Sequence, residues 1–155
     1  MTAILNLPKA AISGPNTATE SLEIRAVAVL TDTYVYTSAV RVLGIEFLNL
    51  ILSYVKGDET SVQIIGQTGV MSDDSVEGTT WKSFWITQAP SSAGVSEVVQ
   101  HVLQLTAANF AADDSGEIPI NVQAKQCVRF GVKATGGTPT GTLGIDCTGS
   151  VEVMT

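Results

Sequence analysis

The stretch GIEFLNLILSYVKGDETSVQIIGQTGVMSDDSVEGTTWKSFW, from Gly44 to Trp85, predicts two long β-strands joined by a tight polar turn, then a polar loop and a third strand. One face of the first strand holds Leu48, Leu50, Leu52 and Tyr54. The other face is also apolar, with Ile45, Phe47, Ile51 and Val55 relieved only by Asn49 and Ser53. A strand that is apolar on both faces is typical of a central strand covered on its outer side, or of a subunit interface.

The rest of the chain predicts further strands separated by turn signals. Residues 21–30 alternate, with Leu22, Ile24, Ala26, Ala28 and Leu30 on one face. Further strands are expected in IPINVQAK (118–125), CVRFGVKA (127–134) and TLGIDCTGSVEV (142–153). Residues 94–106 favour a strand, with a helix over 95–105 as the alternative. Eight or so short strands and no other helical pattern predict an all-β antiparallel β-sandwich or barrel.

The first twenty residues differ in character from the rest of the chain. Residues 1–20 contain two prolines and no sustained periodicity, so they predict an extended N-terminal arm, with a disordered tail as the alternative. The apolar residues Ile4, Leu5, Leu7 and Ile12 are expected to dock on this subunit or on a neighbour. The predicted organisation is therefore an arm over 1–20 and a single β-sandwich domain over 21–155.

Composition and charge exclude several function classes. Charged residues form only 15% of the chain, against roughly 25% in a typical soluble domain. This scarcity indicates either surface buried between subunits or a surface polar through Thr, Ser and Gly. The net charge of −7 and the scattered bases predict no nucleic-acid partner and no anionic membrane partner. We identify no bilayer-spanning run and no secretory signal, so synthesis in the cytoplasm is expected.

Cys127 and Cys147 are the only cysteines. A hairpin centred on Gly137 would set them opposite each other. Matching the apolar faces of its two strands instead pairs Val128 with Cys147, which points Cys127 to the opposite face. We therefore predict two free thiols rather than a disulfide, and no nucleophile, because no base accompanies either cysteine in the sequence.

The remaining reactive residues form no recognisable catalytic set. His101 is the only histidine, which argues against a transition-metal site or a Ser-His-Asp triad. Two acidic loops offer oxygens for a hard cation, but their spacing matches no EF-hand pattern, and solubility of surface loops is the alternative role for these residues. These loops contain Asp73, Asp74, Glu77, Asp113, Asp114 and Glu117. We predict no cofactor, no metal and no enzymatic activity.

The tryptophans are the one carbohydrate-binding candidate. Trp81 and Trp85 alternate onto one face of their strand, with Phe84 and Ile86 on the other. One of these pairs is expected in the core and the other exposed or at an interface. A sugar-stacking platform built on Trp81 or Trp85 is the alternative to packing.

The central stretch resembles a pattern in small structural proteins of tailed bacteriophages. A Tyr-containing opening leads to an apolar strand that ends in Tyr54, Lys56, Gly57, Asp58, Glu59, Thr60 and Ser61, and a second strand runs to a Trp-terminated loop. This chain departs at the last element, where SDDSVEGTTW is longer than the usual SNDGTTW. The closing CVRFGVKATGGTPTGTLGIDC is similar to the last hairpin of that pattern. Roughly residues 34–86 and 126–148 are covered, about half of the chain.

The resemblance implies a virion structural protein of the kind that includes capsid decoration, or cement, proteins. These are jelly-roll-like β-sandwiches, often homotrimers, whose arms or loops clamp neighbouring capsomers. What it implies for this chain is a place on the capsid exterior, with the major capsid protein and further copies of itself as partners. The expected contact residues are Ile4, Leu5, Leu7, Ile12, Phe47, Ile51 and Val55. A glycan- or host-binding module of a phage tail or fibre is the alternative.

Overall fold

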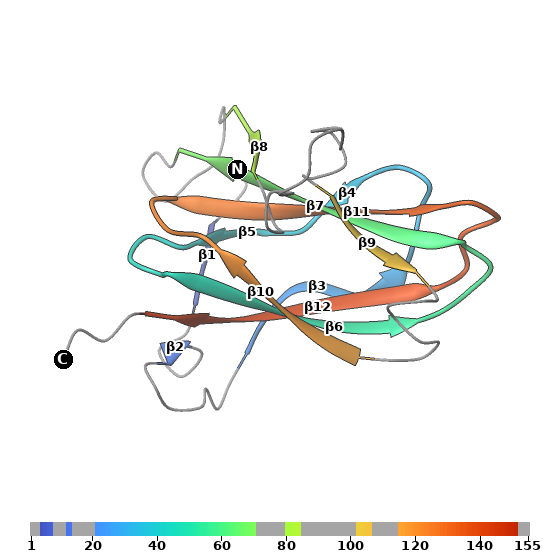
Figure 1. Cartoon of the computed structure of the whole chain (residues 1–155), viewed down its shortest axis with the longest axis horizontal. Helices are drawn as coiled ribbons and strands as arrows, with labels where there is room; N and C mark the ends of the chain where they lie inside the picture. The colour runs from blue at the N-terminus through green and yellow to red at the C-terminus, as the bar shows by residue number, and fades with distance from the viewer. Residues whose placement is uncertain are drawn as a thin grey trace, which may run out of the picture.

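The computed structural model describes residues 4–7, 12–13, 21–70, 80–84, 102–106 and 115–151. These residues form twelve strands and no helix (Figure 1). The strands are β1 (Ile4–Asn6), β2 (Ile12–Ser13), β3 (Leu22–Val29), β4 (Val35–Tyr36), β5 (Ala39–Arg41), β6 (Phe47–Val55), β7 (Ser61–Gly69), β8 (Lys82–Phe84), β9 (Val102–Thr106), β10 (Ser115–Asn121), β11 (Cys127–Thr135) and β12 (Thr142–Ser150).

The strands form two sheets that pack face to face (Figure 1). The five-stranded sheet has the order β10–β6–β12, and both β3 and β2 pair with the other edge of β12. In the seven-stranded sheet β11 lies beside β7, with β4 and β5 outside β11 and with β8 and β9 outside β7. All pairs are antiparallel except β1 with β5 and β2 with β12.

The long strands alternate between the sheets along the chain. β3, β6, β10 and β12 lie in one sheet, and β4, β5, β7 and β11 lie in the other. The spatial orders β3–β12–β6–β10 and β5–β11–β7–β8 are those of a jelly roll, in which two Greek keys wrap around one core. The prediction of an all-β, jelly-roll-like sandwich is confirmed.

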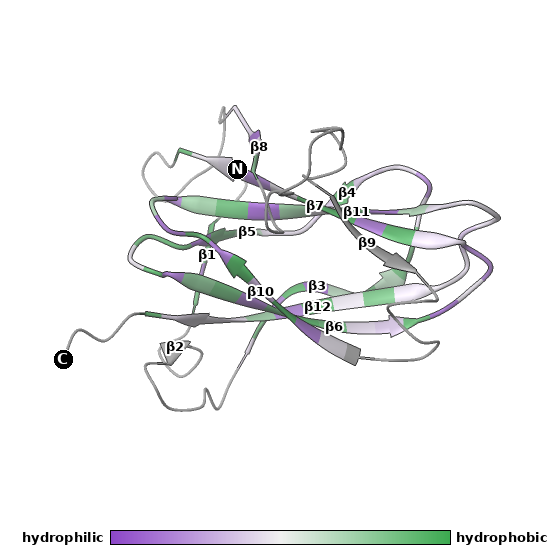
Figure 2. Ribbon diagram, viewed as in Figure 1, coloured by the Kyte–Doolittle hydropathy of each residue, from purple (hydrophilic) through white to green (hydrophobic). Residues whose placement is uncertain are grey.

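The core lies between the inner faces of the two sheets. Alternate residues of β6, β7, β11 and β12 point inward, and Figure 2 shows the matching alternation of apolar and polar segments along the strands. The largest fully buried side chains include Leu48, Leu50, Leu52, Ile64, Phe130, Leu143 and Ile145. The predicted inward face of residues 48–54 is therefore the core face.

At two predicted turns, the strands on either side do not pair with each other as expected. Residues 57–60 do not join paired strands, because β6 and β7 lie in different sheets. Likewise β11 pairs with β7 and β5, while β12 pairs with β6 and β3, so Val128 and Cys147 are not cross-strand partners. A hairpin and a crossover between sheets bury the same alternate residues, so the period of the sequence does not distinguish them.

The first strand of the predicted domain differs from its simple alternation. Ile24 and Leu30 are buried, but Ala26 and Ala28 are exposed. The pairing of β3 with β12 shifts register between Leu143 and Ile145 and again before Asp146, which is the geometry of β-bulges. The bulges rotate the middle of this edge strand away from the core.

Candidate functional site

The outer face of β6 remains the strongest interface candidate. Phe47 is 37% exposed and Val55 is 51% exposed, while Ile51 between them is half-buried. These three residues point away from the core that Leu48, Leu50 and Leu52 fill. Because no second layer of the described residues pairs with this face, the surplus of apolar side chains stays on the surface.

The apolar surface extends from β6 across β12 to β3. Val55 and Val29 lie on either side of Thr142, in register with it. Val27 is 64% exposed and lies over Gly144, where an added Cβ would meet its side chain. Three exposed valines thus gather at one end of the five-stranded sheet.

A row of acidic residues crosses the middle of the same face. Glu117 of β10 pairs with Ile51, Ile51 pairs with Asp146 of β12, and Asp146 pairs with Glu23 of β3. We call these four residues the acidic row. Their neighbours along each strand point into the core, so all four side chains share the outer face. Carboxylates placed directly opposite each other, as Asp146 and Glu23 are, destabilise a sheet.

The expected contact residues of the N-terminal arm pack on the chain itself. β1 is an edge strand of the seven-stranded sheet, and its Ile4 is buried beside Ala39 and Cys127. Leu5 and Leu7 pack against the main core. Ile12 belongs to β2, which pairs with the end of β12 in the other sheet. Of the two alternatives, docking on this subunit is the one found for Ile4, Leu5 and Leu7, and contact with a neighbour stays a prediction.

The outer face of the seven-stranded sheet carries the opposite chemistry. The Arg129 guanidinium lies 4.0 Å from the centre of the Tyr36 ring and 4.3 Å from that of Trp81. The ring centres of Tyr34 and Tyr36 are 6.5 Å apart, and Lys133 Nζ lies 4.7 Å from the Tyr34 ring. We call these five residues the cationic stack.

Two glutamines and a glycine of the seven-stranded sheet support the cationic stack. Arg129 Nε donates a 2.9 Å hydrogen bond to Gln67 Oε1, and the Tyr34 hydroxyl lies 3.3 Å from Gln63 Oε1. Gly131 leaves the space that the Tyr36 ring occupies, since an added Cβ would clash with it. Burial lowers the pKa of Arg129, but the guanidinium stays charged. Sequence reasoning missed this stack because its members come from three separate segments.

Trp81 packs within the chain on two sides. It is half-buried and packs on the Ile4–Ala39–Cys127 cluster as well as on Arg129. Phe84 is the core member of its strand and makes an edge contact with Phe130. Trp85 and Ile86 lie outside the described residues.

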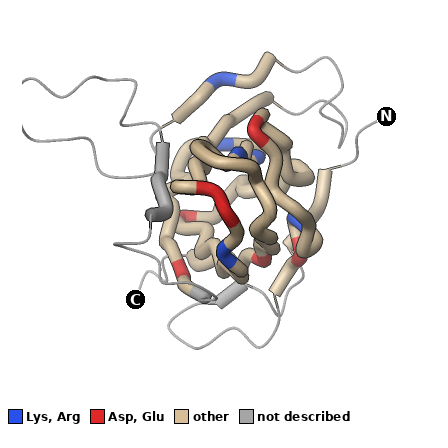
Figure 3. The backbone as a smooth tube through the Cα atoms, turned by 90° about the vertical axis from the view of Figure 1, so that its right-hand side faces the viewer, with Lys and Arg blue, Asp and Glu red and all other residues tan. Residues whose placement is uncertain are grey.

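The motif over residues 56–61 connects two strands, and its Glu59 is buried between two crossovers. Glu59, in the β6–β7 crossover, is 1% exposed and accepts hydrogen bonds from four donors. These are the Tyr54 hydroxyl at 2.6 Å and the amides of Gly57, Gly141 and Thr140 at 2.8, 3.0 and 3.3 Å. Because Thr140 and Gly141 belong to the β11–β12 crossover, the carboxylate ties the two crossovers together. They lie at the end of the sandwich that faces the viewer in Figure 3.

Glu59 stays ionised in this site. Burial on its own raises the pKa of a carboxyl group, but the hydrogen bonds from Tyr54, Gly57 and Gly141 outweigh it and lower the pKa of Glu59 to about 2. Burial and the bond to Glu59 raise the pKa of Tyr54, which keeps the phenol protonated. The pair is a fixed donor and acceptor rather than an acid–base couple.

The cysteines are free, as predicted, and both are buried, although the expected pairing of strands was wrong. Cys127 packs in the small cluster with Ile4 and Ala39, and its Sγ lies 3.3 Å from the Gly69 carbonyl oxygen. Cys147 lies in the main core, where burial and the nearby Asp146 charge raise its pKa to about 12. Neither thiol is poised as a nucleophile at neutral pH.

Several predicted candidates lie outside the described residues: His101, Asp73, Asp74, Glu77, Asp113 and Asp114. The structure places Glu117 in β10 rather than in a loop. Among the residues that are described, no group of acids, histidines and cysteines could hold a metal ion. The described part also contains no helix long and apolar enough to cross a bilayer.

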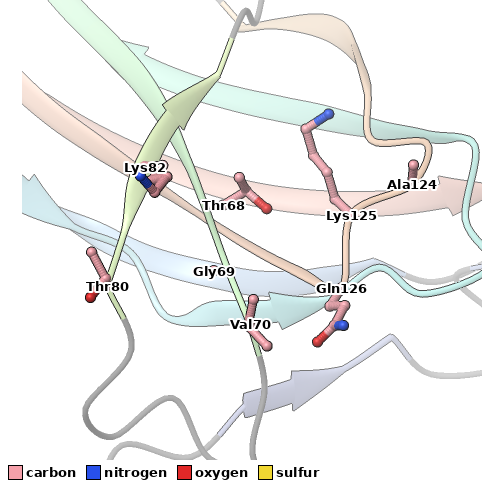
Figure 4. Close-up of a pocket in the computed structure, with 8 residues that line it drawn as sticks. All are labelled: Thr68, Gly69, Val70, Thr80, Lys82, Ala124, Lys125 and Gln126. Atoms are coloured by element: carbon pink, nitrogen blue, oxygen red, sulfur yellow. The ribbon is translucent and has the colours of Figure 1, made fainter.

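A pocket of about 220 Å³ lies beside the end of β7. Figure 4 shows its lining, which comes from β7, the start of β8 and the connection between β10 and β11. Lys82 and Lys125 are its charged residues, and Lys125 Nζ lies 4.8 Å from the Phe84 ring. The described lining holds no carboxylate, histidine or thiol beside these two lysines.

Comparison with models of known protein families found no match to this chain, and comparison with curated proteins found none either.

Proposed function

We propose that this chain is a non-enzymatic structural protein of a phage virion, a capsid decoration protein that stabilises the head by binding between capsomers. The observation that carries this proposal is the outer face of β6, which no other described strand covers and where Phe47, Ile51 and Val55 stay at the surface. Apolar side chains gathered on one sheet face mark a contact with another protein. The partners proposed are the major capsid protein and further copies of this chain, in the homotrimer that the resemblance implies or in another assembly.

The fold and the sparse charge agree with this role. Jelly rolls serve both as viral capsid proteins and as lectin domains, so the fold alone does not decide between them. Most of the described chain carries no charged side chain (Figure 3). A surface of this kind tolerates burial between subunits, because few charges lose their water.

Binding to purified capsids tests the proposal. The protein should add to capsids saturably, with many copies per particle, and should raise the temperature at which the heads lose their DNA. Replacing Phe47 and Val55 together by Ser should weaken binding at least about tenfold, because the apolar centre of the contact is lost. The matched control is Val35→Ser, an exposed valine on β4 of the other sheet.

Two results would contradict this function. One is the absence of the protein from the head, with a low copy number in the tail or neck. The other is a change in tryptophan fluorescence on addition of host polysaccharide, together with failure to bind capsids. The second result would support the glycan-binding alternative, for which Trp81, Tyr34 and Tyr36 supply aromatic surface on one face.

A further inference from the structure

The two outer faces of the sandwich carry opposite charges. The described bases on the outer side of β5 and β11 are Arg41, Arg129 and Lys133, and no described acid lies on that face of these strands or of β7. The outer side of the five-stranded sheet carries Glu23, Asp146 and Glu117 instead. A chain with a net charge of −7 thus presents one distinctly basic surface.

The two cations of the cationic stack are held by contacts within the chain, but no described carboxylate pairs with them. The Arg129 guanidinium contacts the Tyr36 and Trp81 rings, and its Nε donates a hydrogen bond to Gln67. Among the described residues, neither Arg129 nor Lys133 forms an ion pair with a carboxylate. The Oε1 atoms of Gln63 and Gln67 already accept hydrogen bonds within the chain, so the groups these side chains have left for a partner are the N–H donors of their amides. The stack is a pre-formed row of donors that suits a carboxylate-rich surface.

The carboxylates of the acidic row likewise have no cationic partner among the described residues. Asp146 accepts a 3.3 Å hydrogen bond from Ser21, and within the described residues none of the three carboxylates forms an ion pair. Arg25 is the described base nearest in sequence to Glu23, and its Nε donates to the Leu143 carbonyl. Placing Asp146 opposite Glu23 costs stability, and no ion pair among the described residues offsets that cost.

The two rows have similar lengths. Glu23 and Glu117 are three strands apart, which corresponds to about 14 Å at the usual spacing between strands. Arg129 and Lys133 are four residues apart along β11, which corresponds to about 13 Å. One row runs across its strands and the other along its strand. The rows coincide when two sandwiches pack with their strands crossed at near right angles, a recognised arrangement of sheets.

We propose that the cationic stack binds the acidic row of a second copy of this chain. The contact is heterologous, because each copy offers a different face to each neighbour. The two faces lie on opposite sides of the sandwich (Figure 1), so repeated contact produces an open stack rather than a small closed ring. This inference rests on the proposed function, because it takes a further copy of this chain, one of the two proposed partners, as the group that binds the cationic stack.

Sedimentation velocity of the purified full chain tests the contact. At about 50 mM salt the weight-average sedimentation coefficient should rise with protein concentration, and at about 500 mM salt the rise should vanish, because salt screens the paired rows. Arg129→Glu with Lys133→Glu should abolish the rise, and so should Glu23→Lys with Glu117→Lys. Mixing the two double variants should restore it, because each reversed face then meets a complementary one. Lys82→Glu with Lys125→Glu, and Glu46→Lys with Asp58→Lys, are double controls that change the charge equally at residues outside both rows.

Replacing Arg129 also removes its contacts with Tyr36 and Trp81, which lie in and beside the edge strands β4 and β8. Lys133→Glu alone therefore provides a second measurement. It leaves Arg129 between its rings and should still weaken association several-fold. A closed trimer whose sedimentation ignores salt and both double variants would overturn this inference. Saturable capsid binding without self-association would do so too, while leaving the proposed function intact. Self-association that follows the charges without capsid binding would support the stack and remove the capsid role.

Discussion

The hydroxyl of Tyr54 donates a 2.6 Å hydrogen bond to Oε1 of Glu59 inside the sandwich. Tyr54 belongs to the core face of β6, whereas Glu59 lies in the crossover that leaves β6 for the other sheet. The same carboxylate accepts the amides of Thr140 and Gly141 from the second crossover. One buried charge thus fixes both passages between the sheets at this end of the fold.

Replacing Glu59 by Gln should lower the free energy of unfolding by about 3 kcal/mol. The amide group of glutamine would bring a donor against donors, so at least one of the four hydrogen bonds to Glu59 is lost inside the protein. Urea denaturation at pH 7, followed by tryptophan fluorescence, measures the change. Asp58→Asn is the matched control, since Asp58 is exposed and should change stability by less than about 0.5 kcal/mol. Equal effects of both substitutions would contradict this role of Glu59.

Stability should fall as the pH drops from about 5 to about 2. The pKa of Glu59 is about 2 in the folded chain, against an ordinary value of 4.5. A carboxyl group whose pKa is lower in the folded state stabilises the fold above its unfolded pKa, and loses that contribution as protons bind at lower pH. The difference corresponds to about 3 kcal/mol. Denaturation series at several pH values should show this slope, and Glu59→Gln should flatten it; an equally steep slope in the variant would assign the effect to other carboxylates.

The sequence predicted the faces of the strands better than the path between them. Leu48, Leu50 and Leu52 were placed correctly, because alternation reports which side of a strand is buried. The crossovers were read as hairpins, because both connections bury the same residues. The sequence places Glu59 only in a tight polar turn, where a glutamate is usually solvated. Its burial depends on Gly141 and Thr140, which lie more than eighty residues away in the chain.

The candidate surfaces were predictable in part for the same reason. The outer residues of β6 follow from its period, so Phe47, Ile51 and Val55 could be named in advance. The acidic row and the cationic stack could not, because each depends on the register of strands distant in sequence. Arg129 and Trp81 meet only because β8 and β11 flank β7. Such pairings are set by the topology, which local patterns do not contain.

Gly137→Ala should destabilise the fold more than Gly44→Ala. Both glycines have positive φ, 66° and 82°, so an alanine at either position is strained by about 1 kcal/mol. At Gly44 nothing lies near the added Cβ, whereas at Gly137 the Cβ would clash with the backbone of Asp58 in the other crossover. We expect about 1–3 kcal/mol more at Gly137. Thermal and urea unfolding of the two variants measure the difference, and equal losses would mean that the crossovers separate without cost.

Glu23→Gln should stabilise the isolated chain by a few tenths of a kcal/mol, on the order of 0.2–0.5. The substitution removes the repulsion between Glu23 and the directly opposite Asp146, and Glu23 itself is exposed. The gain should disappear at high salt, where the repulsion is already screened. Glu117→Gln is the control on the same face, because Ile51 separates it from Asp146. A loss of stability in the Glu23 variant at low salt would show that the acidic row is held by a partner group within the chain.

Labelling of the thiols should report unfolding of the whole sandwich. Cys127 and Cys147 are both free and fully buried, and burial raises the pKa of each thiol. The thiolate is the reactive form, so native protein at pH 8 should react with a thiol reagent only when the structure opens. In denaturant two thiols per chain should react at once, and fewer would reveal a disulfide.

In a Cys127→Ser variant the remaining Cys147 lies in the main core, so its labelling rate should become lower as the free energy of global unfolding becomes larger. If Glu59→Gln speeds that rate by the factor its loss of stability implies, the hydrogen bonds of Glu59 between the two crossovers keep the core closed. An unchanged rate would show that the core opens independently of these hydrogen bonds.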